Sequence, residues 1–151
     1  MMIMSNDDFI KIPWFVTSLY FSDNFNPSLT SLDLDQLKLL RDLEIGKNCF
    51  RYPLISSFSI HDLHRLERVQ VGDNSFSQSC GAAAMASGVV EIRNCTKLAE
   101  IRIQKCAFVT TGAMVLEALP ALKLLEIGTQ ENSYSFYRAA ELRVARMGMG
   151  I

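Results

Sequence analysis

The sequence lacks an excess of either charge, since 15 basic and 16 acidic side chains leave a net charge of −1 over 151 residues. Strong positive fields gather phosphates and anionic lipids, so this balance argues against nucleic acid and against a membrane as partners. The uncharged run at residues 12–22, IPWFVTSLYFS, is too short to span a bilayer and contains Pro13. Asp7 and Asp8 stand where a secretory signal would carry basic residues. We therefore expect a cytoplasmic protein without a transmembrane segment.

Motifs of common catalytic and cofactor chemistry are missing too: there is no Gly-x-Ser-x-Gly, His-Glu-x-x-His or dinucleotide-binding fingerprint. The two histidines, His61 and His64, flank Leu63, which takes a core position, so we expect both on the surface. Residues three apart on a turn could share a metal ion, but no third ligand or nucleophile accompanies them. We expect no catalytic residue, no cofactor and no metal, and hence not an enzyme. A metal enzyme built on these two histidines is the alternative.

Cysteine pairs at metal-binding spacing are also missing. Cys49, Cys80, Cys95 and Cys106 form no Cys-x-x-Cys motif and have no histidine partners at zinc-finger spacing. Cysteine packs as a small buried hydrophobe, and two of the four fall on positions that core residues would fill. We expect reduced thiols with a structural role.

What the sequence does contain is a folded-domain composition, with 49% hydrophobic and 21% charged residues. A globular chain of this length buries roughly two-thirds of its unfolded surface. One segment recurs four times, beginning at residues 37, 63, 95 and 119: LKLLRDLEIGKNCF, LHRLERVQVGDNSF, CTKLAEIRIQKCAF and LPALKLLEIGTQEN. The successive offsets are 26, 32 and 24 residues, and we attribute the longest to a small-residue insertion at 80–88, CGAAAMASG.

Each repeat contains two short segments in which apolar and polar residues alternate, which is typical of half-buried strands. The first set lies at 32–37, 58–63, 90–95, 114–119 and 142–144, and the second at 43–45, 69–71, 101–103 and 125–127. Apolar residues three apart, such as Leu63 and Leu66, predict a tight inward-facing corner between the two segments. Gly72 and its equivalents Gly46 and Gly128 are expected to permit a turn that other residues resist. Asn74 is expected to bond the backbone in a ladder, and Phe76 to return to the core.

The second segments with their approaches read Leu40-x-x-Leu43-x-Ile45-x-x-Asn48, with equivalents that end at Asn74, Cys106 and Gln130. This pattern resembles the LxxLxLxxN/C core of leucine-rich repeat proteins, and the Ile/Val-Gly-x-x-x-Phe phrase looks like the BspA-like subfamily. Gln130 and Asn132 depart from the pattern in the fourth copy. The resemblance covers residues 29–145. It implies a repeat solenoid: a right-handed superhelix of short parallel β-strands with short helical or irregular connections, and an extended face for macromolecules.

Two domains follow from this reading. Residues 1–28 match no repeat and are rich in aromatic residues, so we expect a capping segment; a binding pocket is the alternative reading of the aromatic cluster. Residues 29–151 form the solenoid, with about four turns and a partial fifth.

The functional hypothesis is a non-catalytic protein that binds an unidentified protein partner through an exposed strand face. The residue between two apolar strand residues points outward. The candidate face comprises Glu44, Arg68, Gln70, Arg102 and Glu126, and a second outward row comprises Asp33, Ser59, Glu91, Val115 and Arg143. The alternative hypothesis is a structural fragment of a longer repeat array with no independent binding role. In that case an uncapped C-terminal turn would favour self-association.

Overall fold

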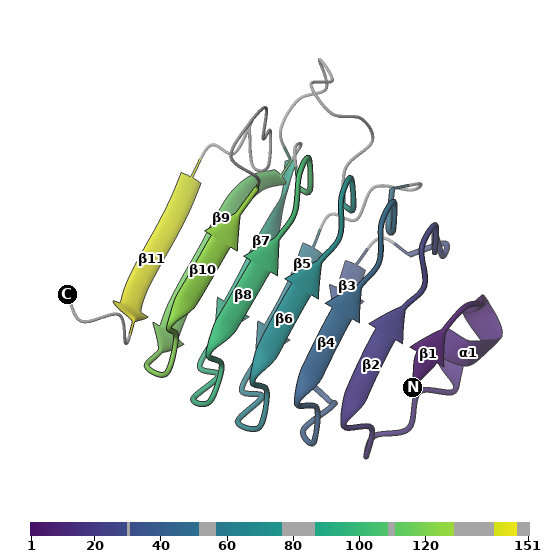
Figure 1. The fold of residues 1–151 in the computed structure, drawn as a ribbon, viewed down its shortest axis with the longest axis horizontal. Helices are drawn as coiled ribbons and strands as arrows, with labels where there is room; N and C mark the ends of the chain where they lie inside the picture. The colour runs from purple at the N-terminus through teal and green to yellow at the C-terminus, as the bar shows by residue number, and fades with distance from the viewer. Residues whose placement is uncertain (30, 52–56, 77–86, 109–110, 129–140, 148–151) are drawn as a thin grey trace.

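The computed structural model describes residues 1–29, 31–51, 57–76, 87–108, 111–128 and 141–147, which form eleven strands and one short helix (Figure 1). The elements are β1 (Met2–Ile3), α1 (Asn6–Ile10), β2 (Ser18–Phe21), β3 (Ser31–Asp33), β4 (Asp42–Ile45), β5 (Ser57–His61), β6 (Arg68–Val71), β7 (Ser87–Arg93), β8 (Glu100–Ile103), β9 (Thr111–Leu119), β10 (Leu124–Ile127) and β11 (Glu141–Met147). Strands form at every repeat position where the alternating pattern predicts one. Most of the predicted insertion, and the departures at Gln130 and Asn132, lie outside the described residues.

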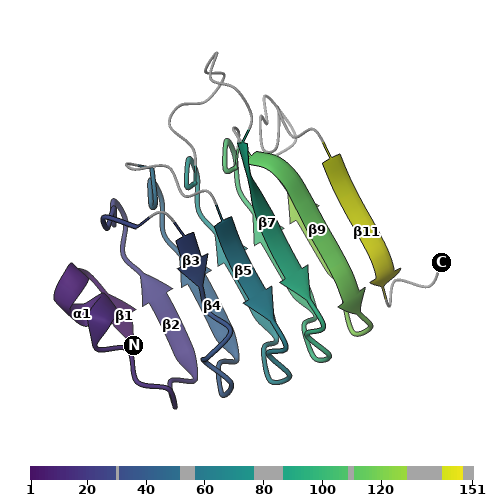
Figure 2. The ribbon, with the colours of Figure 1, turned by 180° about the vertical axis from the view of Figure 1, so that it is seen from behind.

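The strands form two parallel sheets, and successive strands from β2 onward alternate between them. One sheet has the order β1-β2-β4-β6-β8-β10 and faces the viewer in Figure 1, whereas the other has the order β11-β9-β7-β5-β3 and faces the viewer in Figure 2. Within the six-stranded sheet, each strand aligns with the equivalent residues of the next repeat, so that Leu43 pairs with Val69 and Val69 with Ile101. This mostly parallel β structure is compatible with the predicted repeat arrangement.

The corners between paired segments are tight turns, as the apolar spacing predicts. The amide of Leu66 donates to the carbonyl of Leu63 at 3.2 Å, and the same three-residue turn occurs at the equivalent positions of the other repeats. Both apolar residues of every corner are buried: Leu37, Leu40, Leu63, Leu66, Cys95, Leu98, Leu119 and Leu122. They join the alternating inward residues of the two sheets in one hydrophobic core.

Beyond the strands of the six-stranded sheet, the chain repeats a turn with left-handed backbone. Asn74 has φ 61° and Phe76 has φ 56°, and the same pair of positive values recurs one repeat earlier at Asn48 and Phe50. Asparagine adopts this conformation more readily than most residues. The side-chain amide of Asn74 donates to Asn48 Oδ1 at 3.2 Å. The ladder therefore runs from side chain to side chain, rather than from side chain to backbone as predicted.

Two of the three turn glycines are needed because backbone atoms of the neighbouring turn lie very close to them, and not because their φ angles are positive. Neither Gly46 nor Gly72 has a positive φ, whereas Gly128 has φ 78°. A Cβ at Gly72 would lie 2.5 Å from the carbonyl oxygen of Gly46, and a Cβ at Gly46 would lie 2.8 Å from the carbonyl oxygen of Phe21. Successive turns thus stack too closely for a side chain at these positions.

The cysteines differ in part from the prediction. Cys49 and Cys95 are free and buried, as expected of structural thiols. Cys106, by contrast, is disulfide-bonded. Burial raises the pKa of the Cys49 thiol, and it raises the pKa of the Cys95 thiol to about 11.

The N-terminal segment contributes directly to the six-stranded sheet. Ser5 caps α1 by accepting a hydrogen bond from the Asp8 amide, and the Asp8 carboxylate accepts from the Ser5 amide in return. Strand β2 pairs in register with β4, so that Leu19 aligns with Leu43. Phe21 is fully buried, and its ring lies edge-on to that of Phe50 at 5.3 Å. The assignment of residues 1–28 as a cap stays a prediction. Over the part of the chain that the structure describes, no helix has the length and apolar character needed to cross a membrane.

Candidate functional site

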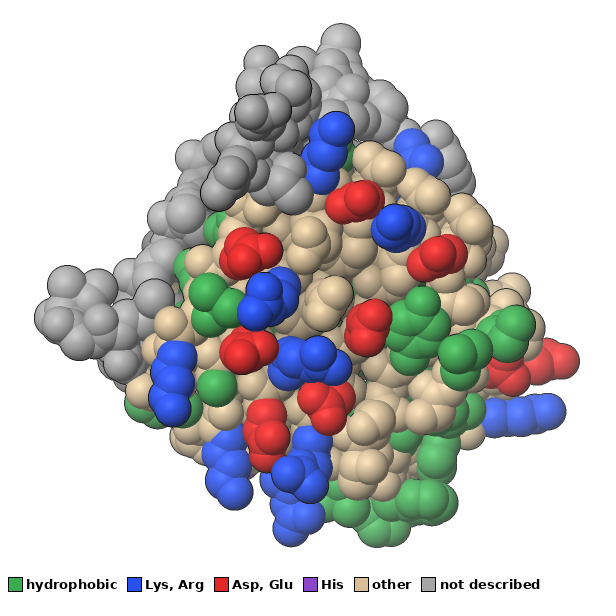
Figure 3. All heavy atoms as spheres, in the orientation of Figure 1, with side chains coloured by type: hydrophobic (Ala, Val, Ile, Leu, Met, Phe, Trp, Pro, Cys, Tyr) green, Lys and Arg blue, Asp and Glu red, His purple; other side chains and the backbone are tan. Residues whose placement is uncertain are grey.

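The outer face of the six-stranded sheet carries all five residues of the candidate binding face. In β2, β4, β6 and β8 alternate side chains are buried, so the intervening ones point outward. The parallel register aligns them in rows that run across the strands. One row comprises Tyr20, Glu44, Gln70, Arg102 and Glu126, and the row beside it comprises Ser18, Asp42, Arg68, Glu100 and Leu124. Figure 3 shows acidic and basic side chains interspersed over this face.

Ion pairs neutralise much of this face within the chain. Arg102 extends one nitrogen to Glu126 at 3.4 Å and another to Glu100 at 3.9 Å. Arg68 pairs with Asp42 at 3.4 Å. These side chains are 38–45% exposed, so each pair contributes at most about 1 kcal/mol to stability. Among the described residues, Glu44 has no ion-pair partner on this face.

Two hollows meet at Tyr20 and Glu44. The first, about 330 Å³, lies toward the start of the strands and is also lined by Met1, Met2 and Arg68. The second, about 460 Å³, lies toward their ends and is also lined by Gln70 and Gln104 and by the two turn glycines. Gly46 and Gly72 continue the outward positions of β4 and β6, and both line the second hollow.

Tyr20 belongs to this site although the sequence pattern does not predict it, because Ser18–Phe21 precedes the recognised repeats. The ring is half-buried. Burial, reinforced by the negative charges of Asp23 and Glu44, raises the pKa of the Tyr20 hydroxyl. Two signals could have located β2: the alternation of Ser18–Phe21, and Asn24 at the same spacing after the strand as Asn48. Asn24 has φ 67°, and its Oδ1 accepts a hydrogen bond from the side-chain amide of Asn48 at 3.3 Å. Asn24 therefore begins the asparagine ladder.

The outer face of the five-stranded sheet holds a different set of charges, centred on His61. The side chain is 30% exposed, with Nδ1 3.2 Å from Asp35 Oδ2 and Nε2 2.9 Å from Glu91 Oε2. The backbone amide of His61 also donates to Asp35 Oδ1 at 2.6 Å. His61 is therefore held between two carboxylates, which corrects the prediction of a merely exposed histidine. His64 is exposed as predicted, and its Nδ1 lies 3.3 Å from Thr96 Oγ1.

The His61 cluster continues across the sheet to Arg93, which lies 3.5 Å from Glu91 and 3.4 Å from Glu117. The pKa of Asp35 is raised by burial, against the lowering effect of His61. Both ring nitrogens of His61 therefore face carboxylates of the same sheet face. Among the described residues, no group of three or more histidine, cysteine or acidic side chains could hold a metal ion.

The second outward row lies on this sheet. Asp33, Ser59, Glu91, Val115 and Arg143 align across β3, β5, β7, β9 and β11. Val115 keeps its predicted place in this row and does not belong to the hydrophobic core cluster, but its side chain is buried. This row therefore offers less continuous polar surface than the row on the six-stranded sheet.

Comparisons with protein-family models, with curated proteins and with solved structures found no match to this chain.

Proposed function

We propose that this chain is a non-catalytic, leucine-rich-repeat-like solenoid that binds another protein through the outer face of its six-stranded sheet. The alternation of the chain between two parallel sheets, with each strand aligned on its equivalent in the next repeat, supports the solenoid. The short stacked turns and the buried phenylalanines at equivalent positions support the resemblance to leucine-rich repeats of the BspA-like kind.

One observation carries the binding role: polar side chains from five successive strands form an open, aligned row. Neighbouring strands lie about 4.8 Å apart, so Glu44, Gln70, Arg102 and Glu126 present regularly spaced groups over a long surface. Extended surfaces of this kind are what repeat proteins offer to macromolecules. The five-stranded sheet is a weaker candidate, because the buried Val115 interrupts the polar row there.

The test is a charge swap, Arg102→Glu with Glu126→Arg. The swap keeps an ion pair within the chain but exchanges the charges that a partner meets. We expect a partner captured by the wild-type protein to be lost from the swapped variant, with a melting temperature lowered only slightly by the loss of the half-exposed Arg102–Glu100 pair. The matched control is Arg41→Glu with Glu67→Arg, which swaps a 3.1 Å pair in a corner, off the strand face. Retention of the partner by the first variant, or its loss from both, would contradict the proposed face.

A further inference from the structure

The groove formed by the two hollows at Tyr20 and Glu44 is unevenly charged, in contrast to the rest of the face. Its lining contains four carboxylate side chains, Asp23, Asp42, Glu44 and Asp73, against three cationic groups, which are the side chains of Arg68 and Lys47 and the amino group of Met1. Arg68 is engaged by Asp42. The amino group of Met1 donates to the Ser18 carbonyl at 2.6 Å at one end of the first hollow. With the Asp42–Arg68 pair set aside, three carboxylates remain against two cationic groups, so the groove keeps a small excess of negative charge.

Glu44 differs from the other glutamates of the same face. Glu100 and Glu126 both lie beside Arg102, which satisfies them. Glu44 is half-buried, aligns with Tyr20 on the neighbouring strand, and has no ion-pair partner among the described residues. A half-buried carboxylate without a counter-charge is a favourable place for a cation from outside the chain.

Tyr20 provides the second half of such a site. Side chains directly opposite on neighbouring strands have Cβ atoms about 5 Å apart, so the ring and the Glu44 carboxylate are adjacent. Lysine and arginine place their aliphatic stems along aromatic surface while the charged head reaches an acid. Burial raises the pKa of Tyr20, and the negative charges of Asp23 and Glu44 raise it further.

We propose that the protein partner presents a basic segment to this groove, with a lysine or arginine side chain lying on Tyr20 and pairing with Glu44. This inference rests on the proposed function, since it identifies the chemistry of the partner on the same face. The hollow beyond Gly46 and Gly72 leaves room for the backbone and the next side chain of the segment, and Asp23 and Asp73 at its rim offer a second basic residue a counter-charge. An acidic segment would meet repulsion at the same place.

The test uses a fluorescent peptide of eight lysines as the probe, with a peptide of eight glutamates as the opposite-charge control. Binding to the full chain is measured by fluorescence anisotropy at low salt, and the site is located from amide shifts in NMR spectra. Glu44→Gln removes the counter-charge without changing shape, and we expect it to weaken lysine-peptide binding about five- to tenfold. The matched control is Glu67→Gln, which removes one negative charge from a corner, outside both hollows. It should change binding less than about twofold.

Amide shifts should concentrate in β2, β4 and β6, and thermal melts of both variants establish that each is folded. Equal weakening by the two substitutions, shifts spread over other surfaces, or equal binding of the glutamate peptide would overturn the inference. The proposed function is judged separately by the Arg102/Glu126 swap. If the swap abolishes partner capture while Glu44→Gln has no effect, the face stands and the basic segment is wrong. If neither variant affects capture, both are wrong.

Discussion

Phe76 shows how single residues hold successive repeats together. Its ring stacks on Phe50 at 4.9 Å with an interplanar angle of 11°, and on Phe108 at 4.6 Å with an angle of 7°. All three residues are buried and share a φ near 55°, so the backbone conformation that turns the chain also directs each ring inward. The stack of three rings therefore holds successive repeats together, and it depends on the backbone conformation of each turn.

Replacing Phe76 with alanine should lower the free energy of unfolding by about 3–5 kcal/mol, because it removes a buried ring and leaves a cavity in the stack. Urea unfolding followed by circular dichroism measures this change. Phe15→Ala is the matched control, since Phe15 is 58% exposed and the same substitution there should cost less than about 1 kcal/mol. A neutral Phe76→Ala would mean that the repeat register is wrong.

Cys95 should make stability fall at alkaline pH. Its thiol pKa is raised from 9.0 to about 11 by burial, so above pH 9 the unfolded chain loses this proton while the folded chain keeps it. The contribution is fully present below pH 9 and is lost as the pH rises toward 11, by up to about 2 kcal/mol. Unfolding at pH 8 and pH 10.5 measures the loss. Cys95→Ala should show a smaller loss over this range, and an equal loss would contradict the assignment.

Residue roles within one repeat could be predicted from the sequence, but contacts between repeats could not. The buried positions of Leu63, Leu66 and Phe76 follow from spacing alone and are confirmed. The sequence predicts His61 on the surface because Leu63 takes the core position beside it. Its carboxylates come from residues 26 and 30 positions away, and only the parallel register brings them together.

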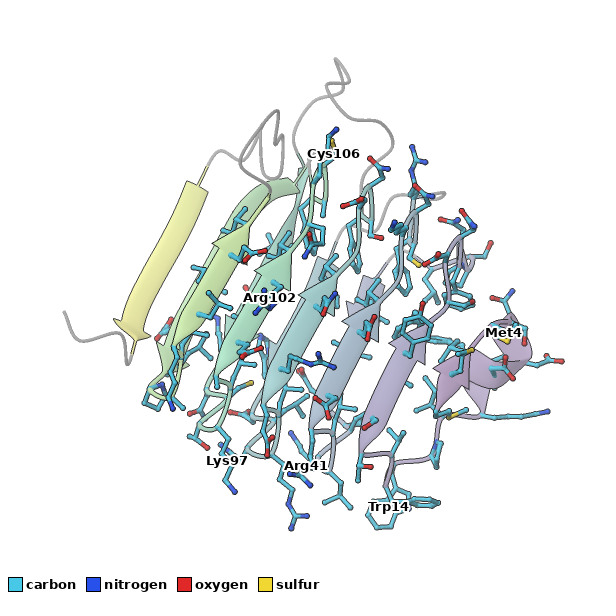
Figure 4. The ribbon with its side chains drawn as sticks, in the orientation of Figure 1. Met4, Trp14, Arg41, Lys97, Arg102 and Cys106 are labelled. Carbon is cyan, nitrogen blue, oxygen red and sulfur yellow. The ribbon has the colours of Figure 1, made fainter. Side chains whose placement is uncertain are left out.

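At the scale of elements, the closeness of successive turns governs how the sheet can be built. Figure 4 shows the strands and their turns stacked side by side along the length of the molecule, from Trp14 at one end past Arg41 and Lys97 along the lower edge. The carbonyl of Gly46 lies so near Gly72 that any side chain there must push two repeats apart. Glycine is therefore required at these turns for space, and at Gly128, with φ 78°, for conformation.

Gly72→Ala should destabilise the protein by about 1–3 kcal/mol through this overlap, even though alanine is a small residue. Chemical denaturation gives the value. Gln70→Ala serves as the control, because Gln70 lies two residues earlier, in β6, and points outward. It should lower the free energy of unfolding by less than about 1 kcal/mol. Gly72→Ala as stable as wild type would show that the turns are further apart than described.

The alternating pattern predicts the strands of the recognised repeats, including β11 in the partial fifth repeat, but it misses β2. Strand β2 has no preceding first segment, and its apolar residues Leu19 and Phe21 sit in a generally aromatic stretch, so the repeat was not recognised there. Its membership of the sheet depends on pairing with β4, which is a tertiary property. The site consequently gained Tyr20 only from the structure.

For the whole molecule, the two sheets present outer faces of different character. Ion pairs of the His61 cluster link the strands of the five-stranded sheet from Asp35 to Glu117. The six-stranded sheet has an open row and a groove in which Glu44 has no ion-pair partner within the part of the chain that the structure describes. Self-association, predicted for an uncapped array, stays a prediction, and a monodisperse monomer on size-exclusion chromatography would contradict it.

The central claim, that a protein partner binds the outer face of the six-stranded sheet, is tested most directly by site-specific photo-crosslinking. A photoreactive phenylalanine derivative replaces Gln70, at the middle of the proposed face, or Ser59, at the outward position of β5 on the opposite sheet. Irradiation in the presence of a captured partner should give a covalent adduct from position 70 and none from position 59. An adduct from position 59 without one from position 70 would contradict the account.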